Sequence, residues 1–279
     1  MQNILVPFDF SNESNAALRA AAEIASRLEA KIYLLNVYEA PEETNDMYSF
    51  SEEALLNYKK LIDEVRQQHE AKLNEVVMKS TFLKSEIESV TRRGFVHKEI
   101  IETVDELEID LVVMGSKGTS TIEEYLIGTN VEKIIQNVAC PVLVIPYVQT
   151  NFTLENLVFA SGFHKDDIPE FEFFKDLSLK FNSTVHLLRV NTPANFARSK
   201  DMRISMEHFS KHWGLTKTTS NIYSDFSIEE GMLEFAKTMD ADLICLHRRH
   251  HRNFFSFLNA RFTDEIVKHS ITKPILILT

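Results

Sequence analysis

Three glycines between residues 115 and 130 have a spacing suited to holding an anion. The segment runs GSKG from Gly115 to Gly118, continues for nine residues, and closes with GTN, which begins at Gly128. Glycine has no Cβ, so backbone N–H groups in such a loop can approach phosphate oxygens closely. Side chains in or beside the loop that can add polar contacts are Ser116, Lys117, Thr129 and Asn130.

The sequence places this loop between a buried strand and a helix. Residues 111–114 are continuously apolar, which predicts a strand. The next apolar residues recur with helical spacing at Val131, Ile134, Ile135 and Val138. Thr129 and Glu132 have capping-box spacing, so the helix is expected to start at about Thr129. The N-terminus of a helix favours phosphate binding, although the negative charge of Glu132 would oppose it. The alternative is that the glycines serve only to form tight turns.

A second segment that could bind a ligand lies between residues 247 and 252. Three histidines and three arginines follow another apolar run there. Neutral imidazoles could ligate a metal ion, and guanidinium groups could hold an anion. The arginines disfavour a nearby cation, so the anion is the favoured ligand of the two, and a solvated basic loop is the third alternative. The residues of this hypothesis are His164, His247, Arg248, His250 and His251.

An internal repeat predicts two domains of the same kind. ILVPFDF at residues 4–10 matches LVFASGF at 157–163, and KIYLLNV at 31–37 matches TVHLLRV at 184–190, both at an offset of 153. The later matches are DLVVM with DLICL at an offset of 132 and CPVLVI with KPILIL at 133. The expected domains are residues 1–148 and residues 154–279.

Each repeat alternates short apolar runs with helical patterns, which predicts an α/β fold. Strands that are apolar throughout are typical of a parallel sheet covered by helices on both faces. Ser11 is a candidate helix cap. Residues 52–76 predict a long charged helix, residues 98–107 a helix, and residues 87–91 a polar strand at an edge. In such doubly wound sheets, ligands bind at the carboxyl ends of the strands.

The second repeat has lost the parts that a phosphate loop needs. His247 stands where the first repeat has Gly115, and His250 stands in place of Gly118. Gly162 replaces Asp9. The second half is therefore not expected to bind a nucleotide in this way, and the simplest alternative is a degenerate copy kept for packing.

These features together resemble the universal stress protein family, in a form with two repeats. The pattern G-x2-G-x9-G-[ST] is the ATP-binding motif of that family. ILVPFDFS (4–11), LLNV (34–37), LVVMGSKG (111–118) and CPVLVIP (140–146) also resemble its strands in order. The resemblance covers essentially the whole chain. It implies two tandem Rossmann-like domains of the adenine nucleotide alpha hydrolase-like kind, each a five-stranded parallel sheet between helices.

The resemblance also implies a site for ATP, with ADP or AMP as alternatives and Mg²⁺ as an optional companion. Asp9 would contact the nucleoside, or else only cap the first helix. The backbone at Val37 would recognise adenine, and Pro7, Phe8 and Met114 would line the adenosine pocket. Val37 and Met114 have a plain core role as the alternative. Ribose and phosphates would be held by Gly115, Lys117, Gly118, Gly128, Thr129 and Asn130, with Lys117 otherwise a solvated lysine.

The resemblance further implies how the two halves associate. Dimers of the family commonly form through the last strands, which are residues 142–145 and 275–278 here. An intramolecular pseudo-dimer is expected, because antiparallel pairing would protect two strand edges. A further homodimer is an additional expectation.

Composition limits the partners and the compartment. The net charge is −11, and residues 1–150 hold all of the acidic excess, which disfavours nucleic acid as a partner. No apolar run approaches the roughly 20 residues of a membrane span. The chain enters a strand without a signal-peptide pattern, and its two cysteines, Cys140 and Cys245, lie in or beside apolar runs. These features predict a cytoplasmic protein with reduced thiols.

Three functions remain open on the sequence. The first is a nucleotide-binding protein of stress response or regulation, and the second is an enzyme that uses ATP, with at most slow hydrolysis. The third is an interaction module with a relic site. A Walker loop and a GxGxxG fingerprint are absent from the sequence, and the spacing supports no catalytic residue.

Overall fold

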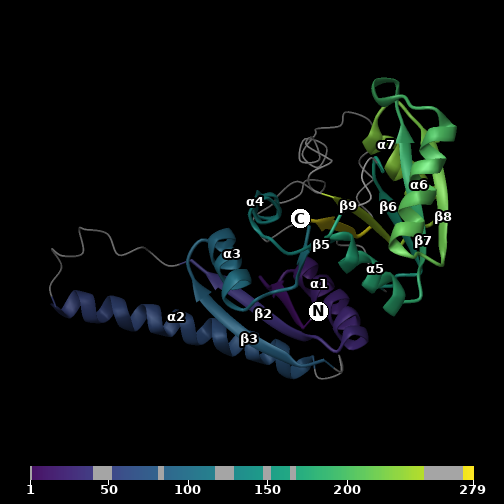
Figure 1. Cartoon of the computed structure of the whole chain (residues 1–279). Coiled ribbons are helices and arrows are strands. Elements are labelled where there is room, and N and C mark those ends of the chain that lie inside the picture. The colour runs from purple at the N-terminus through teal and green to yellow at the C-terminus, as the bar shows by residue number, and fades with distance from the viewer. Residues whose placement is uncertain are drawn as a thin grey trace.

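The fold is taken from a computed structural model of the chain (Figure 1). It describes residues 2–39, 52–80, 85–116, 129–146, 152–163, 168–247 and 273–279. Each half alternates strands and helices, as the sequence predicts. The first half contains β1 (Asn3–Pro7), α1 (Asn12–Leu28), β2 (Lys31–Tyr38), α2 (Glu52–Lys79), β3 (Ile87–Arg93), α3 (Val96–Glu106), β4 (Leu111–Gly115), α4 (Thr129–Asn137) and β5 (Val142–Ile145).

The described part of the second half repeats this order, with shorter first and second helices. It contains β6 (Asn156–Ala160), α5 (Phe171–Lys180), β7 (Thr184–Asn191), the 3₁₀ turn η3 (Pro193–Asn195), α6 (Ser199–Trp213), β8 (Thr218–Ser224), α7 (Ile228–Thr238), β9 (Leu243–His247) and β10 (Ile275–Leu278). α2 is 28 residues long, and α6, which follows the equivalent strand, is 15. Part of α2 projects beyond the sheet (Figure 1).

All ten strands form one sheet, in the order β3-β2-β1-β4-β5-β10-β9-β6-β7-β8. Within each half the neighbouring strands are parallel, and β5 pairs with β10 in antiparallel fashion, with Leu143 opposite Leu276. The fold is therefore two tandem Rossmann-like α/β units, each with a five-stranded parallel sheet. The polar strand predicted at residues 87–91 is β3, and it does lie at an edge. Because β5 and β10 are antiparallel, the carboxyl ends of the two halves' strands face opposite ways.

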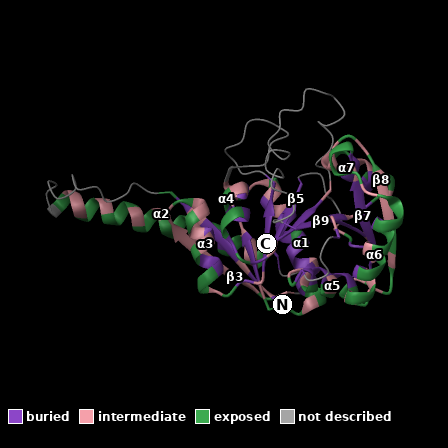
Figure 2. Cartoon of the chain, turned by 45° about the horizontal axis from the view of Figure 1, so that its top comes forward, coloured by how far each residue is buried: buried purple, intermediate pink, exposed green. Residues whose placement is uncertain are grey.

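Two apolar layers lie on the two faces of the sheet (Figure 2). One contains buried residues of α1, α5 and α6 together with Leu73 of α2. The other contains buried residues of α3, α4 and α7. In the first half, α1 packs through alanines such as Ala17 and Ala21, whereas in the second half rings such as Phe171 and Phe209 fill the same layer.

The repeat preserves unusual backbone conformations as well as strands. Among the described residues, six non-glycine residues have positive φ, a conformation that costs on the order of 1 kcal/mol or more each. They form three pairs at the repeat offsets of 153 and 132, so both copies retain the same turns. The pairs are Phe10 with Phe163, Glu29 with Asn182, and Glu108 with Asp240.

One carboxylate holds the start of the first strand in each half. Asp110 accepts hydrogen bonds from the backbone N–H groups of Gln2 and Asn3, at 2.6 and 3.1 Å. Asp242, which lies 132 residues later, accepts them from Glu155 and Asn156 at 2.8 Å each. The two halves therefore share construction at the amino ends of their strands.

Candidate functional site

The carboxyl ends of β1, β2 and β4 form the candidate site of the first half. After β1 the chain leaves toward the α1 face of the sheet, and after β4 it leads to α4 on the other face. β1 and β4 are neighbours, so this is the point at which the chain switches direction and where doubly wound sheets bind ligands. The predicted glycine loop leaves from this point.

Gly115, the last residue of β4, lies against the start of α1. A Cβ placed on Gly115 would be 2.6 Å from the Cβ of Glu13 and 2.9 Å from its carbonyl carbon. Real Cβ atoms do not approach backbone that closely, so a glycine is required. The absence of a side chain brings the amino end of α1 next to the end of β4, where the unpaired N–H groups of a helix start favour an anion.

The turn between β1 and α1 is fixed by hydrogen bonds from polar side chains. Ser11 is the N-cap of α1, as predicted, and its hydroxyl accepts from the N–H of Ser14 at 3.1 Å. The Asp9 carboxylate accepts from both the N–H and the hydroxyl of Ser11. Asp9 thus holds the capping residue Ser11 rather than capping α1 itself, and its position two residues after β1 keeps it beside the candidate site.

A buried amide links the ends of β1 and β2. Phe8 donates its N–H to the carbonyl of Leu35 at 2.7 Å. The side chain of Asn36, only 3% exposed, donates from Nδ2 to the carbonyl oxygen of Phe8 at 2.7 Å. Its Oδ1 lies 2.7 Å from Nδ1 of His69 on α2. Neither Asn36 nor His69 belongs to a sequence motif, and their contact forms only where α2 packs against β2.

The remaining predicted residues of this site lie as follows. Phe8 and Met114 are both buried, but they belong to the apolar layers on opposite faces of the sheet. Pro7 and Val37 are partly exposed at the strand ends. α4 starts at Thr129, as predicted, and Asn130 is its second residue. Lys117, Gly118 and Gly128 lie outside the described residues.

The equivalent edge of the second half contains different groups. His247 ends β9 with 4% exposure, and its Nε2 lies 3.4 Å from a carboxylate oxygen of Glu170. Arg189 on β7 is 8% exposed and donates to the carbonyl of Gly162. Burial lowers the pKa of this guanidinium from its ordinary value. Arg189 is not among the residues predicted from the sequence, although the repeat aligns it with Asn36.

Most of the histidine and arginine cluster proposed from the sequence cannot be placed. His164, Arg248, His250 and His251 lie outside the described residues. Within the ranges that the structure describes, no group of three or more His, Cys, Asp or Glu side chains is arranged to hold a metal ion. The metal and anion hypotheses for that loop therefore remain predictions.

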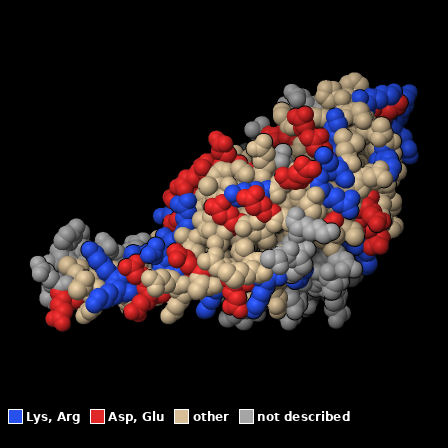
Figure 3. All heavy atoms as spheres, turned by 90° about the horizontal axis from the view of Figure 1, so that it is seen from below, with Lys and Arg blue, Asp and Glu red and all other residues tan. Residues whose placement is uncertain are grey.

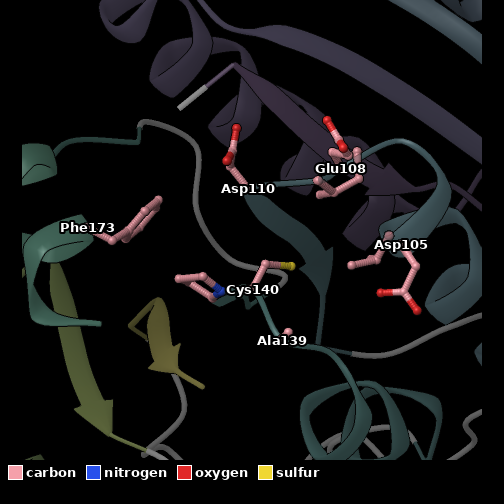
Figure 4. A pocket seen from close by; sticks show the side chains of 9 residues that line it. Asp105, Glu108, Asp110, Ala139, Cys140 and Phe173 are labelled. Carbon is pink, nitrogen blue, oxygen red and sulfur yellow. The ribbon is translucent and has the colours of Figure 1, made fainter. Parts of the chain in front are cut away.

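A groove of about 480 Å³ lies at the opposite edge of the first half, at the amino ends of β4 and β5 (Figure 4). The carboxylates of Asp105, Glu108 and Asp110 line it, Cys140 contributes to its wall, and Phe173 of α5 lies across from Cys140. Burial raises the pKa of the Cys140 thiol to about 12, so the thiol stays protonated at neutral pH. Three carboxylates disfavour phosphate, so this groove is distinct from the predicted nucleotide site.

On the face shown in Figure 3, acidic and basic side chains of the described residues are interspersed. Among the described helices, none combines the length and apolar character needed to cross a membrane.

Comparison with known proteins identifies the class. The sequence profile of the universal stress protein family matches residues 1–146. Two universal stress proteins of Methanocaldococcus jannaschii are each 28% identical to this chain over 153 and 145 residues; each match covers 52% of this chain, and they cover 94% and 81% of those proteins. The chain therefore belongs to the universal stress protein family.

The solved structures extend the fold to both halves. The crystal structure of a universal stress protein from Archaeoglobus fulgidus matches 99% of this chain and 96% of its own length, with a TM-score of 0.72 and 19% sequence identity. At this identity the match shows a shared fold. The match confirms the predicted tandem Rossmann-like architecture, and the family profile confirms the predicted family.

Proposed function

We propose that the first half binds one adenine nucleotide, with ATP as the principal ligand, and that the second half does not. The observation that supports this most is the close approach at Gly115. There the end of β4, the start of α1 and the departure of the glycine loop meet at the switch point of the sheet. An anion held there would meet backbone N–H groups rather than side chains.

The expected contacts follow the strand ends. Asp9 would contact the nucleoside, and the backbone at Val37 would recognise adenine. Pro7, Phe8 and Met114 would line the adenosine pocket at the ends of β1 and β4. The phosphates would lie on the segment from Gly115 to Asn130, with ADP, AMP or an accompanying Mg²⁺ as variants of the same ligand. In this proposal the protein is a cytoplasmic stress-response or regulatory protein.

Isothermal titration calorimetry with ATP tests this proposal. Replacing Gly118 or Gly128 by valine places methyl groups where phosphate must lie, and we expect affinity to fall by at least roughly tenfold. Ser220→Val, on an exposed position of β8, is the matched control and should bind like the wild type. Unchanged affinity in both glycine variants would refute the site assignment, and a stoichiometry of two would refute binding by the first half alone.

The alternative functions give different results in the same experiment. A relic site in an interaction module predicts no ATP binding, and no nucleotide in the mass spectrum of ligand released from the purified, denatured protein. An ATP-using enzyme predicts turnover above that of the Gly118→Val variant. Binding of one nucleotide without turnover favours the regulatory proposal.

We infer in addition that the two halves act as an intramolecular pseudo-dimer. The antiparallel pairing of β5 with β10 supports this, because each half covers the strand edge that the other would expose. A single chain should then need no second copy, and sedimentation should give the 32.2 kDa mass of one chain. A stable species of twice that mass would instead support the additional homodimer.

A further inference from the structure

We propose that His69 is a positioning residue for the adenine side of the nucleotide site, acting through Asn36. The inference rests on the proposed function, because it concerns the same strand ends. His69 lies on α2, beyond the residues predicted to touch the nucleotide. Its contacts nevertheless lead in two steps to the backbone at the end of β1.

The direction of these hydrogen bonds is fixed by chemistry. The Phe8 carbonyl can only accept, so the Asn36 amide must direct its Nδ2 group toward it. Oδ1 of Asn36 therefore faces His69, and it can only accept, so Nδ1 of His69 carries the proton. A neutral imidazole in this tautomer satisfies the buried amide. Burial lowers the pKa of His69, with a smaller contribution from Lys72, which favours that neutral form.

The imidazole is also held from the side. Its ring stacks on Tyr38 at the end of β2, with ring centroids 5.2 Å apart and planes 25° apart. Tyr38 is itself buried at 6% exposure. His69 thus has a fixed orientation, and the Asn36 amide that depends on it has one as well.

The consequence falls on the two strand ends that the nucleotide would touch. Both backbone groups of Phe8 are held: its N–H donates to the carbonyl of Leu35, and its carbonyl accepts from the side chain of Asn36. Asp9 follows Phe8 directly, and Val37 follows Asn36 directly. Without His69, the buried Oδ1 of Asn36 would lose its hydrogen-bond donor, and the amide could rotate. The spacing of the two strand ends would then no longer be fixed before the nucleotide binds.

The second half joins the equivalent strand ends through a different group. The residue aligned with Asn36 is Arg189, and its guanidinium donates to the carbonyl of Gly162, the residue aligned with Asp9. The contact between Asn36 and His69 therefore belongs to the half that has the glycine loop in its sequence.

ATP calorimetry on variants at position 69 tests the inference. His69→Leu removes the donor, and we expect an affinity loss of roughly tenfold. His69→Asn places an amide N–H near the position of Nδ1 and should restore most of the affinity, although it also loses the stacking on Tyr38. Gln68→Leu, an exposed position on the same helix, is the control and should change little.

A second readout does not depend on ATP. In nuclear magnetic resonance spectra of the free protein, the Asn36 side-chain N–H signals should be protected from hydrogen exchange in the wild type and in His69→Asn, and should lose protection in His69→Leu. Equal ATP affinity for wild type and His69→Leu, or an Asn36 amide that stays protected in His69→Leu, would overturn this inference alone. A wild type that binds no nucleotide would overturn the proposed function together with it.

Discussion

The two halves of the chain end their central strands in equivalent rows, which lie at opposite edges of the sheet and contain different side chains. In the first half this row lies one residue beyond the last paired positions of β1 and β2. It contains Asn36, Phe8, Gly115 and Ile145. In the second half the equivalent row contains Arg189, Ser161, His247 and Leu278. One amide is the polar side chain of the first row, whereas a guanidinium, a hydroxyl and an imidazole occupy the second.

This difference extends to the helix that follows the first strand. Four residues, 8–11, separate β1 from α1, whereas ten residues, 161–170, separate β6 from α5. α1 has 17 residues and α5 has 10. Where Gly115 lets the start of α1 reach the strand end, His247 occupies that space and meets Glu170, which immediately precedes α5.

The comparison shows that the two halves share a fold while their strand-end rows differ. Both halves have turns with positive φ at equivalent positions, and both have a carboxylate, Asp110 or Asp242, that holds the start of the first strand. The strand-end row is not needed for the sheet itself. Buried side chains fill it in the second half, and a side chain at the Gly115 position removes the space through which backbone N–H groups would approach a phosphate.

The largest effect should come from moving one residue of the second row into the first. Gly115→His places a Cβ 2.6 Å from Glu13, against the α1 backbone. We expect the unfolding free energy to fall by about 3 kcal/mol or more, because overpacking against backbone cannot relax cheaply. Urea unfolding measures this loss, and ATP binding should disappear in calorimetry.

Two further variants locate the cause of that effect. Gly115→Ala already carries the offending Cβ, so it should show most of the loss in stability. Lys133→His, on an exposed position of α4, introduces the same side chain without the contact and should be nearly neutral. If Gly115→Ala were as stable as the wild type, the contact with Glu13 would not explain why the first half needs a glycine.

The sequence predicted the repeated architecture more fully than it predicted the site. Short apolar runs in one order, twice, suffice for strands and their order, and the capping pattern of Ser11 and the start of α4 at Thr129 were confirmed. The contacts of Asn36 with His69 could not be predicted, because they join β2 to a helix whose rotation depends on tertiary packing. The contact of His247 with Glu170, which immediately precedes α5, was equally hidden, since it joins the end of one strand to a distant part of the sequence.

The smallest effect concerns pH, and it compares one histidine from each half. Burial lowers the pKa of His69 and that of His186, which lies on β7 with Nδ1 2.8 Å from the Thr219 hydroxyl. As the pH falls below the ordinary histidine value of 6.5, the unfolded chain takes up these protons first. The stabilisation is complete above that value and is lost as the pH falls through the lowered folded-state pKa.

Urea unfolding at pH values of about 7.5 and about 5.5 should therefore show a lower unfolding free energy at the acidic pH. His186→Gln removes one of these imidazoles and should reduce this difference, and combining it with His69→Asn should reduce it further. His212→Gln, on an exposed position near the end of α6, should leave it unchanged. If the difference between the two pH values were the same in His186→Gln as in the wild type, the buried imidazole of the second half would have no part in it, and the pH response would have to arise in the first half.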